Sequence, residues 1–241
     1  MKLKINPNIK IMKSVKFLLI SLPLCIFFSS FQTKAQKETT IDVGNNFETI
    51  KVFDGIQAEL YPSDRNEVVI TGINEDEVET EVENGKLKIK MNLDNVWSKG
   101  NTKVKIHFQN ITDIDVNEGA SVDVMEKLKQ PTLNLRSQEG SRILADIEVG
   151  VLNVKSVTGS EIELSGTAEN SQIKIKTGGK FNGVDLKTKT TQVSLTAGGF
   201  AKVNASDYVK AKVKLGGKIE IYGNPDKVDR KTTLGGKIIN Q

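Results

Sequence analysis

A glycine motif recurs from residue 111 to the end of the chain, and its regular spacing restricts the fold more than any other feature. In each copy a glycine is followed by Gly, Ser or Ala, and successive first glycines are 18 to 21 residues apart. A period near 20 residues indicates a repeat protein, in which each repeat is one small unit that stacks on its neighbours. The seven first glycines are Gly119, Gly140, Gly159, Gly178, Gly198, Gly216 and Gly235.

The residues that flank each glycine pair alternate between apolar and polar. Ile173 and Ile175 precede Gly178, for example, and Ile162 and Leu164 follow Gly159. A period of two is typical of a strand with one buried face, so each repeat holds two short strands. Glycine between them permits positive φ and a tight corner, and we therefore interpret the seven first glycines as structural corner residues.

These patterns predict an all-β chain that forms a β-solenoid. Residues 111–241 would form seven coils of 19–20 residues, because the exported part of the chain contains no stretch of helical periodicity. Residues 36–110 would supply irregular N-terminal β coils and a cap of the same domain, since a solenoid needs its first apolar face covered. Within that segment we expect strands at 47–56, 68–72, 87–91 and 103–108 and a hairpin turn at Asn84-Gly85.

The start of the chain resembles a cleaved export signal. Basic residues up to Lys16 precede an apolar run, Phe17 to Phe28, of 12 residues. A membrane span needs about 20 apolar residues, so this run is too short to be an anchor. We expect a signal peptide at residues 1–35, cut after Ala35 or Gln36, with Met12 as an alternative start. The protein would then reside in the periplasm, on the outer membrane surface or outside the cell.

Removal of this signal changes the charge of the chain. The whole sequence has 34 Lys and Arg against 30 Asp and Glu, and residues 1–35 contain six Lys and no acid. The exported chain would therefore hold 28 basic and 30 acidic residues, a net charge of −2. The overall charge gives no support for nucleic acid or an anionic membrane as a partner.

The chain offers few groups for catalysis or for cofactors. Cys25, the only cysteine, lies inside the signal, where we interpret it as an apolar residue; the other interpretation is a lipidation site. His107, the only histidine, lies on the polar phase of a strand, and no phosphate-binding or calcium-binding repeat motif is present. We therefore expect no cofactor and no metal site.

Carboxylates are numerous, and they leave two functions open. Acidic clusters on a solenoid face are typical of polysaccharide lyases and glycosidases, which gives a carbohydrate-active enzyme as the alternative function. The acids interleave with Lys and Arg, however, as on a solvated face with cross-strand ion pairs. The acids concerned are Asp113, Asp115, Glu118, Asp123, Asp146, Glu148, Glu161 and Glu163.

Several of these segments resemble the auto-transporter adhesin "head GIN domain" family, which is common in Bacteroidetes. The resemblance rests on the glycine corners, on the opening Phe53-Asp54-Gly55-Ile56, on the 82–89 hairpin and on the closing Ile221-Tyr222-Gly223-Asn224-Pro225. It implies a fold like a right-handed β-helix, an extracytoplasmic location and no catalytic residues.

The prediction for function is a non-enzymatic envelope or surface protein that acts as an adhesin or as a binding or structural module. Its partner would be a surface glycan or protein. Trp97, in a polar loop, is the one candidate contact residue, because aromatic rings often stack on sugars. The last coil would present an open end near Ile219, Ile221, Leu234 and Ile238, which favours a homodimer through the C-terminal coil; the alternative is a monomer whose end is blunted by polar residues.

Overall fold

The computed structural model describes residues 38–44, 47–72, 75–92 and 102–241. The chain divides into two units, residues 1–35 and 36–241, and every described residue belongs to the second. The predicted signal with Cys25 and the candidate contact Trp97 therefore lie outside the described residues. Within those residues, no helix is long and apolar enough to cross a membrane.

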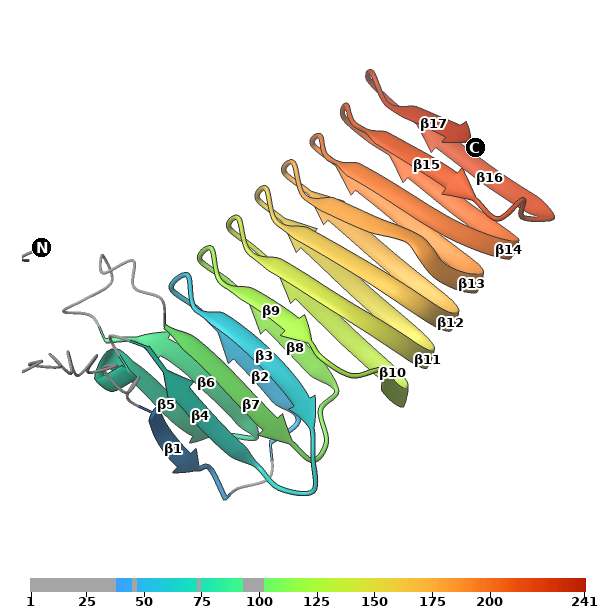
Figure 1. Cartoon of the computed structure of the whole chain (residues 1–241). Coiled ribbons are helices and arrows are strands. Elements are labelled where there is room, and N and C mark those ends of the chain that lie inside the picture. The colour runs from blue at the N-terminus through green and yellow to red at the C-terminus, as the bar shows by residue number, and fades with distance from the viewer. Residues whose placement is uncertain (1–37, 45–46, 73–74, 93–101) are drawn as a thin grey trace, which may run out of the picture. The chain divides into compact units, whose positions relative to one another are not determined.

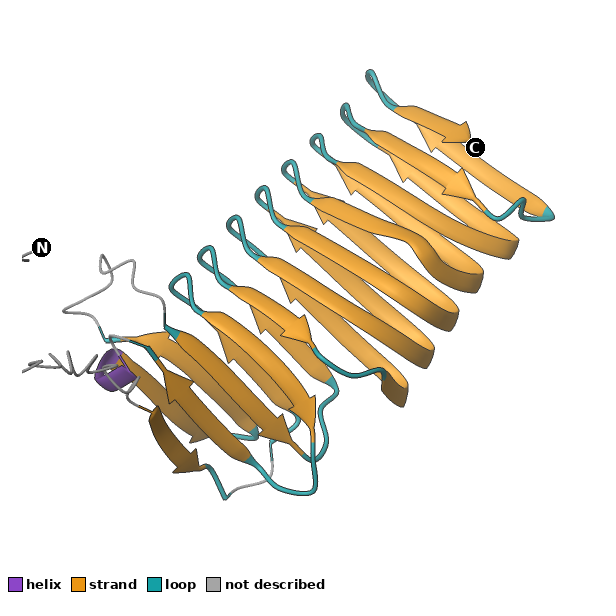
Figure 2. Ribbon diagram, viewed as in Figure 1, coloured by secondary structure: helices purple, strands orange, loops and turns teal. Residues whose placement is uncertain are grey.

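The described residues form strands and a single 3₁₀ turn (Figure 2). The N-terminal elements are β1 Glu38–Asp42, β2 Thr49–Val52, β3 Gln57–Pro62, β4 Glu67–Thr71, η1 Glu75–Glu77, β5 Val78–Glu83, β6 Lys86–Met91, β7 Lys103–Phe108, β8 Asp113–Val116 and β9 Ser121–Val124. The others are β10 Leu128–Ser137, β11 Arg142–Val157, β12 Glu161–Lys176, β13 Lys180–Thr196, β14 Phe200–Val213, β15 Lys218–Tyr222, β16 Lys227–Thr232 and β17 Lys237–Asn240.

These strands build a β-solenoid of about seven turns with about 19 residues in each turn, and this confirms the predicted fold class. Each coil starts at a glycine corner, follows one sheet, bends, and returns along a second sheet to the next corner (Figure 1). Strands β11 to β14 are long because each continues through the bend from one sheet to the other. We call the sheet before each corner the pre-corner sheet and the other the post-corner sheet.

Each corner is a tight turn in which two successive residues have positive φ. In the turn at Gly140, φ is 56° at Glu139 and 75° at Gly140, and Ser141 N donates to Gln138 O over 3.2 Å. Two positive φ values define the type I′ turn, which favours glycine at its second central position. The corners also stack, since Gly140 N donates to Thr158 O at 3.1 Å in the next coil.

An eighth corner lies earlier in the chain than the sequence analysis placed the repeat. Asp54 and Gly55 have φ of 57° and 70°, and Gly55 N donates to Glu118 O at 2.9 Å. The expected strand 47–56 was therefore too long: β2 ends at Val52, because Asp-Gly adopts the two positive φ values of a type I′ turn.

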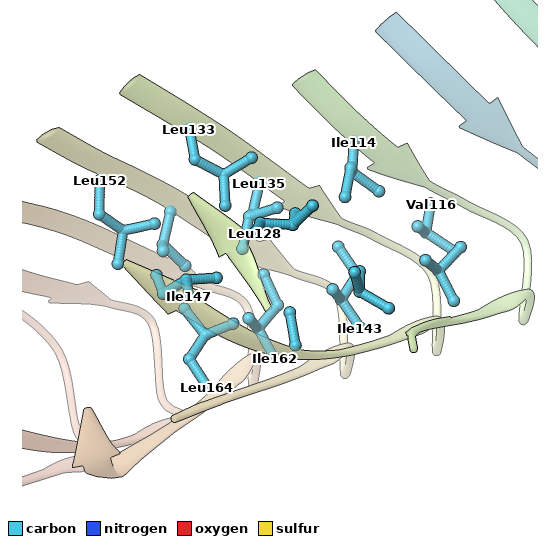
Figure 3. Close-up of a cluster of buried hydrophobic side chains, with 14 of the residues drawn as sticks. Ile114, Val116, Leu128, Leu133, Leu135, Ile143, Ile147, Leu152, Ile162 and Leu164 are labelled. Atoms are coloured by element: carbon cyan, nitrogen blue, oxygen red, sulfur yellow. The ribbon is translucent and has the colours of Figure 1, made fainter. Parts of the chain in front are cut away.

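The core lies between the two sheets and is filled by the predicted apolar positions (Figure 3). Ile143, Ile162 and Leu164 point inward from the post-corner sheet. Ile114 and Val116 do so from the pre-corner sheet. All five are at most 1% exposed. Because the parallel strands keep equivalent positions of successive coils in register, their apolar side chains stack from coil to coil and form one continuous core.

The N-terminal end of the solenoid is closed by antiparallel strands. In the post-corner sheet, β4 pairs with β7 and β1 pairs with β4; in the pre-corner sheet, β5 pairs with β6. Phe47, Val78 and Met91 bury their side chains against the first coils. The acidic segment 75–83 forms η1 and the edge strand β5.

Candidate binding surfaces

The sequence-predicted corner glycines all adopt the left-handed backbone conformation of the turn. Gly119, Gly140, Gly159, Gly178, Gly198, Gly216 and Gly235 all have φ between 61° and 76°. At the later corners the second residue is also glycine, for a steric reason. A Cβ at Gly217 would lie 2.5 Å from Leu195 Cδ2, and one at Gly236 would lie 2.5 Å from Val213 Cγ1.

His107 lies on the outer face of the post-corner sheet, beside Tyr61 on β3. The two rings stack with their centroids 5.2 Å apart. Tyr61 Oη donates to Glu59 Oε2 at 2.8 Å, and this hydrogen bond raises the pKa of the Tyr61 hydroxyl above its ordinary value. The structure therefore gives His107 an aromatic neighbour that the sequence analysis did not name.

Four of the eight acids that suggested an enzyme form ion pairs with basic neighbours. Asp115 lies 2.9 Å from Lys51, and Glu163 lies 3.4 Å from Arg142. Among the described residues, no group of three or more His, Cys, Asp and Glu is arranged to hold a metal. This arrangement is that of cross-strand ion pairs on a solvated sheet. Two more such pairs are Asp146 with Lys127 and Glu148 with Lys129.

The outer face of the pre-corner sheet carries a row of cations that the sequence analysis did not identify. We call this row the cation column; in register along the solenoid it comprises Lys88, Lys51, Asp115, Arg136, Lys155, Lys174, Ser194, Lys212 and Lys231. Seven of its nine members are basic, and the one acid, Asp115, lies near Lys51 and Arg136. Lys155 and Lys174 form no ion pair with any described residue.

Lys155 shows that these charges repel one another. Burial lowers the pKa of its ammonium group below the ordinary value, and the nearby charges of Arg136, Lys176 and Lys174 lower it further. The charge of Asp115 opposes this shift but does not reverse it. Like charges on adjacent strands are destabilising, so this row exists at a cost to the free energy of folding.

A second row of side chains, also in register from coil to coil, runs beside the cation column. Asn134, Asn153, Gln172 and Gln192 occupy successive coils, and we call them the amide column. Asn153 Nδ2 donates to Asn134 Oδ1 at 2.9 Å, which leaves other amide atoms of the row free to face solvent. An open hollow of about 470 Å³ lies over the two columns, lined by Asn134, Arg136, Asn153, Lys155, Gln172 and Lys174 among others.

A larger hollow, of about 910 Å³, follows the bends opposite the glycine corners. Its lining includes Glu148, Thr167, Glu169, Lys187 and Lys189 from three successive coils. Lys189 Nζ lies 2.9 Å from Glu169 Oε1, so the main charges of this hollow neutralise each other. It therefore offers polar contacts without a preference for either sign of charge.

The sequence did contain a signal for the two columns. From Gly119 to Gly235, the cation column lies four residues before each first glycine; from Gly140 to Gly198, the amide column lies six residues before it. The apolar positions, three and five residues before the glycine, predict the buried face, and the positions between them lie on the solvated face. Alignment of those outward positions by repeat would have shown the row of basic residues.

Comparison with protein families assigns the chain. The family model described as "Putative auto-transporter adhesin, head GIN domain" matches residues 46–225. The chain belongs to this family. The matched range includes both columns up to β14, so the cations and amides lie within the family domain. Among curated proteins, none matches the sequence.

Solved structures share the solenoid fold of this family member. A putative adhesin from Bacteroides fragilis NCTC 9343 has a TM-score of 0.78 and 19% identity, covering 86% of this chain and 98% of that one. A putative adhesin from Parabacteroides merdae ATCC 43184 has a TM-score of 0.69 and 17% identity, with 86% and 96% covered. A putative lipid binding protein from Parabacteroides distasonis ATCC 8503 has a TM-score of 0.66 and 16% identity, also with 86% and 96% covered. At these identities the likeness concerns the fold.

Proposed function

We propose that this chain is an exported, non-enzymatic binding module of the cell envelope that acts as a surface adhesin. Membership of the head GIN domain family and the naming of similar structures as putative adhesins or a putative lipid binding protein support a surface binding role. The predicted signal at residues 1–35 supports export.

The observation that carries this proposal is the uninterrupted, in-register stack of coils. From β8 to β17 the coils pair in parallel, and the register shifts only at the bends between β12, β13 and β14. Equivalent outward side chains are therefore repeated along a rigid face, as in other solenoids that bind extended partners. An enzyme of this architecture needs a cleft with catalytic carboxylates, whereas Asp115, Asp146, Glu148 and Glu163 form ion pairs on the outer faces of the sheets.

Cell fractionation with protease shaving of intact cells tests export and surface location. We expect a chain shortened by the signal in the envelope fraction, and we expect protease added to intact cells to remove it. A protected, processed chain would place it in the periplasm, and full-length protein in the cytoplasm would contradict the proposal.

A sugar-release assay tests the enzymatic alternative. We expect the purified protein to release no unsaturated or reducing sugar from pectins, alginates or host glycans, with or without calcium. Activity that disappears in the Asp123→Asn variant, while the variant keeps its melting temperature, would establish the enzyme instead.

A further inference from the structure

We propose that the outer face of the pre-corner sheet binds an acidic polysaccharide laid along the solenoid axis, between the amide column and the cation column. This inference rests on the proposed binding function and names its ligand class and its site. The hollow of about 470 Å³ over Asn134, Arg136, Asn153, Lys155, Gln172 and Lys174 is the centre of the site.

The cations without an ion pair indicate an anionic ligand. Arg136, Lys155 and Lys174 occupy three successive coils, which are about 4.8 Å apart. Two acids, Asp113 and Asp115, lie at one end of the hollow, where Asp115 pairs with Lys51 and Arg136 and leaves Lys155 and Lys174 without an acidic partner among the described residues. The same position tolerates an acid at Asp115 and a hydroxyl at Ser194, so the fold does not require a base there. Anionic groups placed over Lys155 and Lys174 would relieve the repulsion and form charge-assisted hydrogen bonds.

The amide column indicates that the anion is a polysaccharide. Asn and Gln side chains offer both donors and acceptors, which suits the hydroxyl groups of sugars. Because the amides run parallel to the cations over Asn134, Asn153 and Gln172, a ligand would present hydroxyls along one edge and anions along the other. A chain of charged monosaccharides has this form, and its repeated contacts would add to the affinity.

Other polyanions fit this face less well. The exposed large apolar residues Met125, Leu144, Val151, Leu215 and Leu234 all lie outside both columns, so neither row inserts an apolar side chain into a lipid bilayer. Neither column contains an aromatic residue, and single-stranded nucleic acid is usually held by aromatic stacking.

Binding of defined polymers to the exported protein tests the proposal. The probes are polygalacturonate and dextran sulfate as acidic polysaccharides, uncharged dextran as their control, and vesicles of phosphatidylglycerol for lipid headgroups. We expect binding to the two acidic polymers that weakens as salt increases, because screening weakens exposed ionic contacts. We expect no binding to dextran, and binding to the vesicles alone would overturn the proposal.

Paired variants locate the site. Lys155→Gln combined with Lys174→Gln should weaken binding about tenfold or more, since hydrogen bonds to charged groups contribute about that factor each. The control is Lys180→Gln combined with Lys237→Gln on the post-corner face, where both lysines are exposed, and it removes the same charge. An equal loss in the control would overturn the assignment to the pre-corner sheet.

Two further variants separate a binding role from a structural one. Lys155→Arg combined with Lys174→Arg keeps the charge and should keep the binding. The Gln pair should keep or raise the melting temperature, because it removes like-charge repulsion. Asn153→Ala with Gln172→Ala should weaken binding without changing its salt dependence. Surface-located protein that binds neither acidic polymer would overturn this inference and leave the proposed function in place.

Discussion

The two residues of each corner are constrained for different physical reasons. The first glycine needs positive φ, and a Cβ at Gly140, Gly159 or Gly216 would meet no atom within 4 Å. The second residue instead faces the core. Ser141 is buried and its Oγ lies 2.7 Å from Ser137 Oγ. At the later corners a Cβ would meet either a core side chain, as at Gly217 and Gly236, or the backbone of the preceding coil, as at Gly179.

Gly216→Val tests the backbone requirement of the first position. Its φ of 61° would be strained in a β-branched residue, at a cost of about 1–3 kcal/mol. We expect the melting temperature to fall by roughly 2–4 °C for each kcal/mol. Lys180→Ala, at an exposed site, is the control and should change stability by less than about 0.5 kcal/mol. Equal melting temperatures would contradict the role of this glycine as a corner residue.

Gly236→Ala tests the steric requirement of the second position without a change in φ. The new Cβ would lie 2.5 Å from Val213 Cγ1, an overpacking that typically costs about 1–3 kcal/mol. Val213→Ala removes the clashing methyl groups, so the double variant should lose less stability than the two single variants together. A coupling of about 0.5–3 kcal/mol in chemical denaturation is expected. Strict additivity would rule out this contact as the cause.

At the scale of the elements, the first corners stack carboxylates on one another. Asp54, Glu118 and Glu139 occupy equivalent positions in three adjacent turns. A hydrogen bond from the Glu118 carboxyl to Asp54 raises the pKa of Glu118, and burial and the charges of Asp54 and Glu139 raise it further. The corner stack therefore stores repulsion at neutral pH that protonation relieves.

Glu118→Gln should raise the melting temperature at neutral pH. A carboxyl group whose pKa is raised by folding stabilises the fold when protonated, and this contribution is lost as the pH rises through the raised pKa. The gain should be below about 1 kcal/mol, because Glu118 is exposed and solvent screens its charge. The difference between variant and native protein should vanish as the pH falls below the ordinary range of glutamate. Glu126→Gln, at an exposed bend residue, is the control, and an equal effect there would contradict the corner stack as the source.

Strands could be predicted from the sequence where apolar and polar residues alternate locally. They were harder to predict where contacts with residues distant in the sequence determine the conformation. The expected strand 103–108 coincides with β7, and Ile162 and Leu164 are buried as their period of two requires. The sequence pattern predicted a strand at Asp54-Gly55, because this single Asp-Gly lies in an apolar run and no equivalent corner motif occurs nearby in the sequence. Its partner, Glu118-Gly119, lies 64 residues later, beyond the antiparallel strands of the cap.

For the whole molecule, the net charge does not reveal the cation column, on which the proposed binding depends. The predicted exported chain has a net charge of −2, which by itself gives no support for an anionic partner. In the structure, seven bases line one column of the pre-corner sheet, and among the described residues acids pair only with its N-terminal members: Glu81 and Glu83 with Lys88, and Asp115 with Lys51 and Arg136. Lys155 and Lys174 lie apart from these acids. A sum over the sequence does not report this separation, because the positions that share a face are about 19 residues apart.

The predicted homodimer would form through the C-terminal coil, and it stays a prediction. Ile219 and Ile221, expected near the open end, are at most 1% exposed, because β17 covers them. Arg230 pairs in register with buried Ala211, so its side chain leaves β16 on the core side. Its Nη2 donates to Asn240 Oδ1 on β17 at 2.6 Å and bridges the two sheets across the end.

Inward-pointing charge is a common protection of exposed strand edges, so this bridge favours the monomeric alternative. We expect light scattering across a dilution series to show a monomer up to high micromolar concentration. Arg230→Leu should instead produce association that grows with concentration, since it replaces the bridge by an apolar side chain at the end of the core. Native protein that dimerises at low micromolar concentration, and loses the dimer on Ile238→Lys, would establish the homodimer and contradict the role given to Arg230.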